Sequence, residues 1–408
     1  MALLIRNLAQ IATPTGRAGV RGAAMRKLTI HDDAVIVVRD GRIAYVGPER
    51  RSRIAITEDY DAGRATAIPG FVDSHTHLPW AGDRESEFNR RLQGETYEQI
   101  AASGGGIAST VRATRAATEE KLIENVLARA HARSLYGTTT AEAKSGYGLN
   151  LEDELKQLRA IQKANETSPV RLVPTCLAAH DFPPERRDPS YVDEIVNKIL
   201  PAVAAKKLAK FCDAFVERGA FTAEQADRVL RAGIGHRLKP RLHADEFSDG
   251  GGAALAVELR AASADHLMQV SERGIAALAK SGTVANLLPA TSFFLMSQRY
   301  APARALIDAG AIVSLSTDCN PGSSMTESMS TVIQLATLQM KMTVEESLTA
   351  ATLNGAHSLQ MGGDTGSIEV GKRADIVLLD APNYLHLVYH FGVNLVRAVM
   401  RDGQFVVG

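Results

Sequence analysis

Short apolar runs alternate with longer amphipathic stretches through the middle of the chain. The short runs are rich in β-branched residues, as at 138–144 and 283–288, and this composition predicts buried strands. In the stretches between such runs, for example 119–135, 152–164 and 191–205, apolar residues recur every three or four positions, which predicts amphipathic helices. The alternation of the two is typical of parallel strands joined by helices.

Eight strands of this kind follow one another along the chain. They are predicted at residues 68–77, 138–144, 170–180, 210–217, 240–245, 262–266, 283–288 and 311–318. Eight parallel βα units fit a closed TIM-like (β/α)8 barrel, because closure leaves no unpaired sheet edge. An open doubly wound sheet is the alternative, but the first βα turn lacks the Gly-x-Gly-x-x-Gly sequence of that fold. We therefore expect an α/β protein built on a barrel.

The two ends of the chain have a different pattern, in which short alternating segments are separated by turn sequences. Asp-Gly pairs, which are strong hairpin signals, stand at 40–41 and 402–403. This pattern predicts that both ends together form one small β-sandwich-like domain. The predicted domains are residues 1–67 for the first part of the small β domain, residues 68–360 for the catalytic barrel and residues 361–408 for the second part of the small β domain.

Composition and charge narrow the choice of partners. The 408 residues include 46 Lys and Arg and 46 Asp and Glu, so the net charge is zero. Proteins that bind nucleic acids or membrane surfaces usually carry a basic face, so we expect a small-molecule partner, no nucleic acid and no membrane. The N-terminus has neither the basic region nor the apolar stretch of a signal peptide, which predicts a cytoplasmic protein. The three cysteines lack Cys-x-x-Cys spacing and are expected to be small buried hydrophobes.

Histidines and acidic residues stand at the ends of several predicted strands. The carboxyl ends of all strands in a barrel open on the same face, so these residues become neighbours although they are far apart in the sequence. The set consists of His75, His77, His180, His243, Glu246, His266 and Asp318. Any one of these histidines alone is readily explained by a local hydrogen bond, but their concentration at strand ends predicts a metal-binding or proton-transferring site.

Three imidazoles and one carboxylate from this set suit a single transition-metal ion. Residues two apart on an extended chain point the same way, so His75 and His77 can bind one ion. Together with His243 and Asp318 they suit Zn2+ or Fe2+/Fe3+ with one position left for water, whereas calcium and magnesium prefer more oxygen ligands. Such an ion lowers the pKa of bound water from 15.7 to about 7 and polarises a carbonyl. The sequence therefore predicts a metal-dependent hydrolase.

Proton transfer and substrate binding need further residues. Glu246 lies three residues beyond His243, where it can face the reacting water without binding the metal, although a solvated loop carboxylate is the alternative interpretation. His266 can share the proton transfer or stabilise an oxyanion. Arg84 follows the first strand and can bind a carboxylate with two parallel hydrogen bonds, although arginines in such loops are often plain surface charge.

Three glycine-containing loops follow the strands. The sequence Lys-Ser-Gly-Tyr-Gly at 144–148 would let Tyr147 lean over the pocket, and the loop at 318–323 offers an amide and backbone donors. The third loop, Ser-Gly-Gly-Gly-Ile at 103–107, lacks the Lys-Ser/Thr that follows the glycines of a phosphate-binding loop. We expect it to be a flexible lid over the site.

Two motifs resemble the amidohydrolase superfamily of metal-dependent barrels. They are Pro-Gly-Phe-Val-Asp-Ser-His-Thr-His at 69–77 and Gly-Lys-Arg-Ala-Asp at 371–375, so the resemblance spans nearly the whole chain. Many members of this superfamily hold two metal ions bridged by a carbamylated lysine at the end of strand four. Here the lysine of that strand, Lys210, stands at the start of the strand. The resemblance therefore implies one metal ion, zinc or iron, per subunit.

Further motifs resemble the imidazolonepropionase family within that superfamily. They are the segments 103–107, 144–149, 179–185 (Ala-His-Asp-Phe-Pro-Pro-Glu), 243–247 (His-Ala-Asp-Glu-Phe) and 389–394 (Tyr-His-Phe-Gly-Val-Asn). This resemblance implies a homodimer that opens the ring of 4-imidazolone-5-propanoate with water at its cyclic amide and gives N-formimidoyl-L-glutamate in histidine degradation.

The resemblance also implies a role for each matching residue. The implied metal ligands are His75, His77, His243 and Asp318. The implied catalytic residues are Glu246, His266 and Asp318. The implied contacts to substrate or product are Arg84, Tyr147, His180, Glu246, Asn320, Gly322 and Ser323.

Two other functions are compatible with much of this sequence. A single-metal aminohydrolase that removes ammonia from a neutral purine, pyrimidine or triazine would use a similar ligand set, but it would have no need of the carboxylate-binding Arg84. A non-catalytic barrel that serves as an assembly subunit would be expected to lose metal ligands. The complete candidate ligand set favours an enzyme, and Arg84 favours an anionic substrate.

Overall fold

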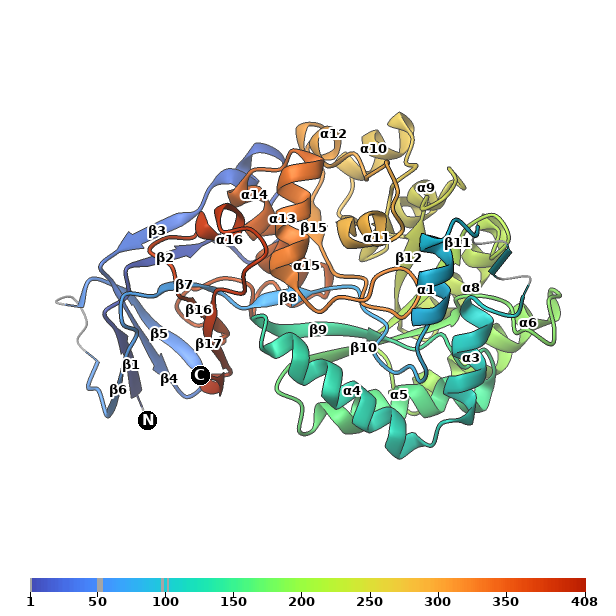
Figure 1. Cartoon of the computed structure of the whole chain (residues 1–408), viewed down its shortest axis with the longest axis horizontal. Helices are drawn as coiled ribbons and strands as arrows, with labels where there is room; N and C mark the ends of the chain where they lie inside the picture. Colours follow the sequence, from blue (N-terminus) through green and yellow to red (C-terminus); the bar gives the residue numbers. More distant parts are fainter. Residues whose placement is uncertain (1, 50–53, 97–98, 101–102) are drawn as a thin grey trace.

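The structure is a computed structural model that describes residues 2–49, 54–96, 99–100 and 103–408. Eight parallel strands, hydrogen-bonded in chain order, form the large sheet on the right of Figure 1. They are β8 Phe71–Asp73, β9 Thr138–Lys144, β10 Arg171–Ala179, β11 Phe211–Val216, β12 Lys239–Ala244, β13 Ser263–His266, β14 Val284–Leu287 and β15 Val313–Leu315. The fold class expected from the sequence, an α/β barrel, is confirmed.

The chain segments that follow the first and last barrel strands close the sheet. Thr76 and Cys319 form a parallel bridge, the amide of His77 donates to the carbonyl of Cys319 at 3.0 Å, and the amide of Asp318 donates to the carbonyl of His75 at 3.1 Å. These bonds bring the His-x-His segment beside Asp318 at the seam of the barrel.

The strand predicted at 68–77 is wrong in one respect, because it is two strands in two different sheets. β7, Thr66–Pro69, pairs antiparallel with β16, Ile376–Leu379, in the small β domain, and β8 starts the barrel. The break falls at Gly70, where a Cβ atom would collide with the side chain of Thr139. The apolar run is continuous across the break, so hydrophobicity alone could not reveal it.

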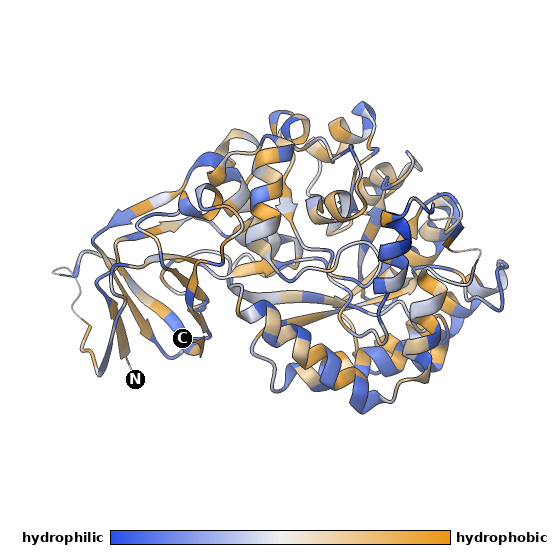
Figure 2. Cartoon of the chain, in the orientation of Figure 1, coloured by the Kyte–Doolittle hydropathy of each residue, from blue (hydrophilic) through white to orange (hydrophobic). Residues whose placement is uncertain are grey.

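Helices cover the outside of the barrel. They are α1 Glu85–Leu92, α3 Ile107–Ala116, α4 Glu119–Ser134, α5 Leu151–Asn165, α6 Ser190–Glu194, η3 Ile195–Ile199, α7 Leu200–Ala205, α8 Ala223–Gly235, α9 Gly252–Glu258, α10 Glu272–Ala279, α11 Pro289–Phe294, α12 Ala303–Asp308, α13 Met329–Met340, α14 Val344–Thr349, η4 Ala350–Asn354 and α15 Gly355–Ser358. The predicted helix 191–205 is α6 and α7 joined by the π-helical turn η3. Figure 2 shows α4 and α5 with both hydrophobic and hydrophilic residues, as expected for helices with one face against the barrel.

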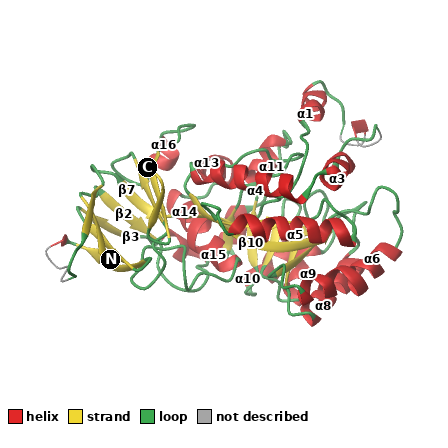
Figure 3. Cartoon of the chain, turned by 90° about the horizontal axis from the view of Figure 1, so that it is seen from below, coloured by secondary structure: helices red, strands yellow, loops and turns green. Residues whose placement is uncertain are grey.

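Both chain ends build two further sheets, which lie together on the left of Figure 3. One sheet has the strand order β5-β4-β1-β6 and the other β18-β17-β16-β7-β2-β3. The new strands are β1 Ala2–Arg6, β2 Gln10–Thr13, β3 Thr29–Asp32, β4 Val35–Arg39, β5 Arg42–Gly47, β6 Glu58–Asp61, β17 Val396–Arg401 and β18 Gln404–Val407; the short helices η1 Gly22–Arg26 and α16 His386–Tyr389 lie between strands. Residues from both sheets, including Ile5, Ile36, Ile11, Ile376 and Met400, form one buried cluster.

Ion pairs join the barrel to the small β domain and also lie within the barrel. Arg171, at the start of β10, reaches Asp375 at 2.9 Å and Asp402 at 2.8 Å and so joins the barrel to the small β domain. Within the barrel, the carboxylate of Asp73 is 3.0 Å from Arg133 and accepts bonds from Thr317. No helix in the described part of the chain is both long and apolar enough to cross a membrane.

Candidate active site

The predicted site residues meet at the carboxyl end of the barrel strands. All of them except His75 line one cavity of about 620 Å³, and His75 lies directly beneath it with no exposed surface. The residues from the prediction that line the cavity are His77, Arg84, Tyr147, His180, His243, Glu246, His266, Asp318, Asn320, Gly322 and Ser323. The structure therefore brings together residues that the sequence places on six different barrel strands or the loops after them.

The predicted metal ligands belong to two overlapping three-residue groups, each compact enough to hold one ion. One ligand atom each from His75, His77 and His243 lie within 4.8 Å of one another, and the same holds for His75, His266 and Asp318. Oδ1 of Asp318 is 3.4 Å from Nε2 of both His75 and His77. Among the described residues, Nε2 of His75 and Nε2 of His243 are buried without a hydrogen-bond partner. Buried imidazole nitrogens without partners are costly unless a ligand takes them, so this donor set fits a metal ion.

Two buried aspartates fix the orientation of two of these imidazoles. Nδ1 of His75 is 2.6 Å from Oδ2 of Asp265, and Nδ1 of His243 is 3.2 Å from Oδ1 of Asp213. An imidazole held through one nitrogen presents the other to the centre of the site, which is the usual arrangement around metal ions. Burial lowers the pKa of His75, but the carboxylates of Asp265 and Asp318 outweigh it and raise that pKa to about 9. Surroundings that attract a proton this strongly also suit a metal cation.

Beneath the histidines lies a fully buried cluster of charged residues. Nζ of Lys144 is 2.6 Å from Asp213 and 2.8 Å from Glu142, and Arg241 reaches Glu142 at 3.0 Å and Asp265 at 3.4 Å. Lys144 holds the pKa of the Asp213 carboxyl well below its usual value although burial opposes this. The cluster therefore keeps the carboxylates that orient the histidines ionised.

These supporting residues were not predicted from the sequence. Asp213 interrupts an otherwise apolar strand, and Asp265 directly precedes His266. The sequence signal that could have identified Asp213 is a charged residue inside a strand that is buried on both sides, because such a charge needs a partner. Lys210, the lysine of strand four, donates instead to the carbonyl of Leu359 at 2.7 Å.

Glu246 and His266 face one another across the cavity. Nδ1 of His266 is 3.5 Å from Oε1 of Glu246, and both side chains are almost completely buried. Burial, together with the nearby Asp318 and Glu217 carboxylates, raises the pKa of Glu246 well above its ordinary value. Burial lowers the pKa of His266 to about 4. The pair therefore combines a carboxyl group that favours a proton with an imidazole that favours the neutral form.

His180 and Tyr147 form an aromatic wall beside His77. The His180 ring stacks on the His77 ring with 5.1 Å between centroids, and the Tyr147 ring meets it edge-on at 5.2 Å. Nδ1 of His180 is 2.9 Å from the carbonyl of Gly146, which leaves its other nitrogen for a ligand. Burial lowers the pKa of His180 to about 3 and raises the pKa of Tyr147, so both side chains are uncharged at neutral pH.

The loop after β15 is a tight turn held by Asn320. The side-chain oxygen of Asn320 accepts the amides of Gly322 and Ser323, each at 2.8 Å, while its nitrogen donates to the Ser323 hydroxyl at 2.9 Å. The amide of Asn320 thus shapes the turn from within. Gly322 presses against Arg84, since a Cβ atom at this position would lie 2.8 Å from Cζ of Arg84.

Backbone strain is present at two of the site residues. His266 has φ 77° and Asp318 has φ 54°, values in the left-handed region that residues with a Cβ atom rarely adopt. Such strain is typical of sites where the surrounding structure fixes a side-chain direction.

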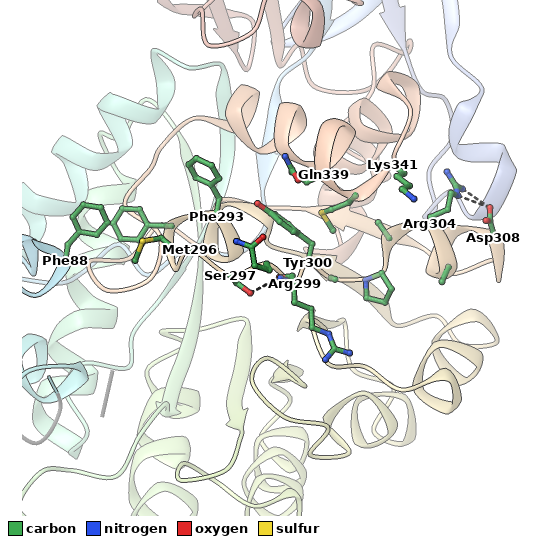
Figure 4. Close-up of a pocket in the computed structure, with 17 residues that line it drawn as sticks. Phe88, Phe293, Met296, Ser297, Arg299, Tyr300, Arg304, Asp308, Gln339 and Lys341 are labelled. Atoms are coloured by element: carbon green, nitrogen blue, oxygen red, sulfur yellow. Dashed lines mark hydrogen bonds and ion pairs between the residues drawn. The ribbon is translucent and has the colours of Figure 1, made fainter. Parts of the chain in front are cut away.

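Further lining residues were not predicted from the sequence. They are Arg91, Glu95, Ile107, Phe215, Glu217, Arg218, Phe247, Ser248, Leu295 and Met296. Met296 also lines a separate surface groove of about 1090 Å³, and Figure 4 shows Phe88 and Met296 at the same end of this groove. Phe215 lies in β11 and Arg91 in α1, whereas Ile107 and Phe247 belong to the motifs at 103–107 and 243–247.

Comparison with known proteins agrees with this geometry. The sequence profile of the amidohydrolase family matches residues 66–406. An imidazolonepropionase of Geobacillus sp. (strain WCH70) is 48% identical over 99% of this chain and 98% of its own length. An imidazolonepropionase of Parabacteroides distasonis is 47% identical over 98% of both chains.

Solved structures show the same fold at much lower identity. An adenosine deaminase from Xanthomonas campestris with bound zinc superposes with a TM-score of 0.71 at 20% identity, over 99% of this chain and 92% of that one. At this identity the likeness concerns the fold alone. The profile match over most of the sequence and the full-length relatives at nearly half identity show that the chain belongs to the amidohydrolase family.

Proposed function

We propose that this protein hydrolyses the cyclic amide of 4-imidazolone-5-propanoate to give N-formimidoyl-L-glutamate, a step of histidine degradation. The observation that carries the proposal is the full-length identity of 46–48% to several proteins named imidazolonepropionase. The cavity supports it independently, because a metal-ligand set, a proton-transferring pair and an arginine surround a space that suits a small planar ring with one carboxylate.

In this proposal His75, His77, His243 and Asp318 hold one ion of zinc or iron per subunit. When bound, such an ion supplies Lewis acidity that polarises the ring carbonyl and lowers the pKa of water. His266 lies near His75 and Asp318. Because the buried carboxyl of Glu246 faces it, we assign His266 to the chemistry. A three-histidine, one-carboxylate set accepts either metal.

The protein side chains orient the substrate around the reacting carbonyl. Arg84 binds the propanoate, because a guanidinium matches a carboxylate with two parallel hydrogen bonds. Tyr147 and His180 contact the ring from the aromatic wall. Ser323 contacts the substrate from the turn after β15, while Asn320 and Gly322 lie on the side where the product carboxylate forms.

Hydrolysis requires that one C–N bond of the ring be broken and that two protons be transferred, one from the attacking water and one to the departing nitrogen. Water adds to the ring carbonyl carbon, which becomes the new carboxylate, and the ring nitrogen leaves as part of the formimidoyl group. Glu246 takes a proton from the attacking water and delivers one to the departing nitrogen. His266, neutral at pH 7, donates a hydrogen bond to the oxygen on which negative charge develops.

The partners, cellular location and oligomeric state of the enzyme are also part of the proposal. The zero net charge supports a small-molecule metabolic role without nucleic-acid or membrane partners. We place the enzyme in the cytoplasm as a homodimer, a state that light scattering on the purified protein measures directly.

The decisive experiment is incubation of the metal-loaded protein with freshly made 4-imidazolone-5-propanoate. Loss of the ring absorbance and appearance of N-formimidoyl-L-glutamate by mass spectrometry are expected, with about one zinc or iron per chain by elemental analysis. Absence of turnover by protein that contains the metal would contradict the proposed substrate.

A further inference from the structure

A buried glutamate that the proposed reaction does not use contacts the substrate-binding arginine. Glu87 lies in the first turns of α1 and is only 8% exposed. Its Oε2 accepts a hydrogen bond from Nε of Arg84 at 2.7 Å. Among the described residues, no other hydrogen bond or ion pair of the Arg84 guanidinium is formed. The Nη1 and Nη2 end of the guanidinium is therefore left for a ligand.

The same carboxylate binds the glycine-rich loop that precedes α3. The amide of Gly106 donates to both oxygens of Glu87, each at 3.1 Å. A Cβ atom at Gly105 would lie 2.9 Å from Oε1 of Glu87, and Gly106 has φ 73°. Both glycines are thus required for the backbone to approach this carboxylate. Glu87 joins two segments of the cavity wall that are separate in the sequence.

Two further contacts restrict the Arg84 guanidinium and helix α1. Gly322 lies against the Arg84 guanidinium, with no room for a side chain between them. On the other face of α1, the Phe88 ring stacks on Phe294 with 4.7 Å between centroids, close to the groove of Figure 4. α1 is therefore held from outside by Phe88 while Glu87 points inward to Arg84.

We propose that Glu87 is a positioning residue for the substrate carboxylate. It occupies the Nε edge of Arg84, so the propanoate meets the Nη1 and Nη2 edge in one fixed orientation, and it couples this orientation to the loop at Gly105 and Gly106. The proposal rests on the proposed function, because it assigns Arg84 to the propanoate of 4-imidazolone-5-propanoate. Glu87 thereby determines substrate specificity through its contact with Arg84.

The opposite effect would follow if Glu87 only screened the charge of Arg84. A negative neighbour weakens the attraction between a guanidinium and an anionic ligand, so its removal would then tighten substrate binding. Positioning and screening therefore predict KM changes of opposite sign for the Glu87→Ala variant.

The test measures kcat and KM of Glu87→Ala with 4-imidazolone-5-propanoate and with its uncharged propanamide analogue. We expect KM for the propanoate to rise about 10- to 100-fold, as for loss of a charge-assisted hydrogen bond, with kcat within about threefold of the wild-type value. The propanamide should show no comparable change. Glu85→Ala, at an exposed position of the same helix, is the matched control and should match the wild type.

A double-mutant cycle shows whether Glu87 acts through Arg84. In the Arg84→Ala background, Glu87→Ala should have no further effect on KM, because the group it positions is gone. Gly322→Ala tests the same idea from the other side, since its Cβ would push the flexible end of Arg84 away and raise KM in the same way. It also serves if Glu87→Ala does not fold. Glu87→Gln keeps an oxygen for Nε of Arg84 and should therefore keep KM closer to the wild-type value than Glu87→Ala does.

Several results would overturn the positioning role. They are a KM that falls or stays unchanged in Glu87→Ala, effects of Glu87→Ala and Arg84→Ala that add fully, and a loss confined to kcat. If the wild-type protein turns over no 4-imidazolone-5-propanoate, the proposed function fails first. Wild-type turnover with an unaffected KM in Glu87→Ala and Gly322→Ala rejects this inference alone.

Discussion

Nζ of Lys144 lies 2.6 Å from Oδ2 of Asp213, and both side chains are completely buried. Asp213 in turn faces Nδ1 of His243, so one ion pair connects the interior of the barrel to a proposed metal ligand. Removing one partner of a buried pair leaves an uncompensated charge, which typically costs about 3–5 kcal/mol. Lys144→Met should therefore lower the free energy of unfolding by this amount and weaken metal affinity about 10- to 100-fold.

Urea unfolding and competition with a chromophoric chelator measure these two effects of Lys144→Met. Lys163→Met is the control, because Lys163 forms an ion pair of similar length with Glu166 at an exposed position; exposed pairs contribute little. A Lys144 variant with wild-type metal affinity would show that the charged cluster does not support the ligands.

Loss of a metal ligand should abolish both metal binding and activity. His243→Ala removes one imidazole from the group formed with His75 and His77. We expect kcat/KM to fall roughly a thousandfold, since metal assistance is worth several kcal/mol, and elemental analysis to show metal loss. His236→Ala, at an exposed position after α8, should keep both metal and activity. Chelation of the wild type should have the same result as His243→Ala, with recovery on adding zinc or iron.

Arg84 distinguishes a hydrolase for an anionic substrate from an aminohydrolase for neutral bases. Arg84→Ala should lower kcat/KM for 4-imidazolone-5-propanoate about 10- to 100-fold, because it removes charge-assisted hydrogen bonds to the propanoate. The exposed Arg273→Ala is the control for loss of a surface charge. Steady-state kinetics distinguish the two functions. Equal kcat/KM values for the Arg84 variant and the wild type would favour the aminohydrolase alternative.

Glu154 should make the stability of the protein depend on pH. Its carboxyl is fully buried beneath the Tyr147 loop, where Oε1 accepts the amides of Gly148 and Leu149 at 2.8 and 2.9 Å. Burial raises its pKa above the ordinary 4.5 despite these bonds. The folded protein then binds more protons than the unfolded chain between the two pKa values, so this group's contribution to stability grows as pH falls through the folded pKa towards 4.5.

The corresponding variant is Glu154→Gln, which keeps an acceptor oxygen but carries no charge. It should be more stable than the wild type at pH 8, and the difference should shrink as pH falls to 5, as followed by urea unfolding at both pH values. Glu152→Gln, on the exposed side of the same helix, should show no such trend. A wild-type advantage that grows towards pH 8 would refute the assigned direction.

The fold was largely predictable because the buried strands of a parallel barrel appear in the sequence as short runs rich in apolar and β-branched residues. The predicted strand at 138–144 coincides with β9. The break at Gly70 was not predictable, because β7 and β8 pair with different strands, β16 and β9, which are remote in the sequence. Likewise the strand predicted at 311–318 is regular only over Val313–Leu315, since the residues beyond it bend to close the barrel.

The candidate site was predictable where a side chain type carries chemistry by itself. Histidines at strand ends could be selected before the structure was known, and the structure places them around one cavity. Asp213, Asp265 and Glu87 escaped selection because their importance lies in the partner each contacts. A carboxylate acquires such a role only through three-dimensional contacts that spacing in the sequence does not encode.

The seam of the barrel imposes an order of events on the growing chain. His75 and His77 leave the ribosome early, but Asp318 and Cys319, which lie in the segment that bridges the seam, emerge only after all eight barrel strands. β7 cannot form its antiparallel pair until β16, still later in the chain, has been translated. The nascent protein therefore lacks part of the proposed metal-ligand set until most of the chain has been translated, so the proposed set can bind an ion only late in synthesis.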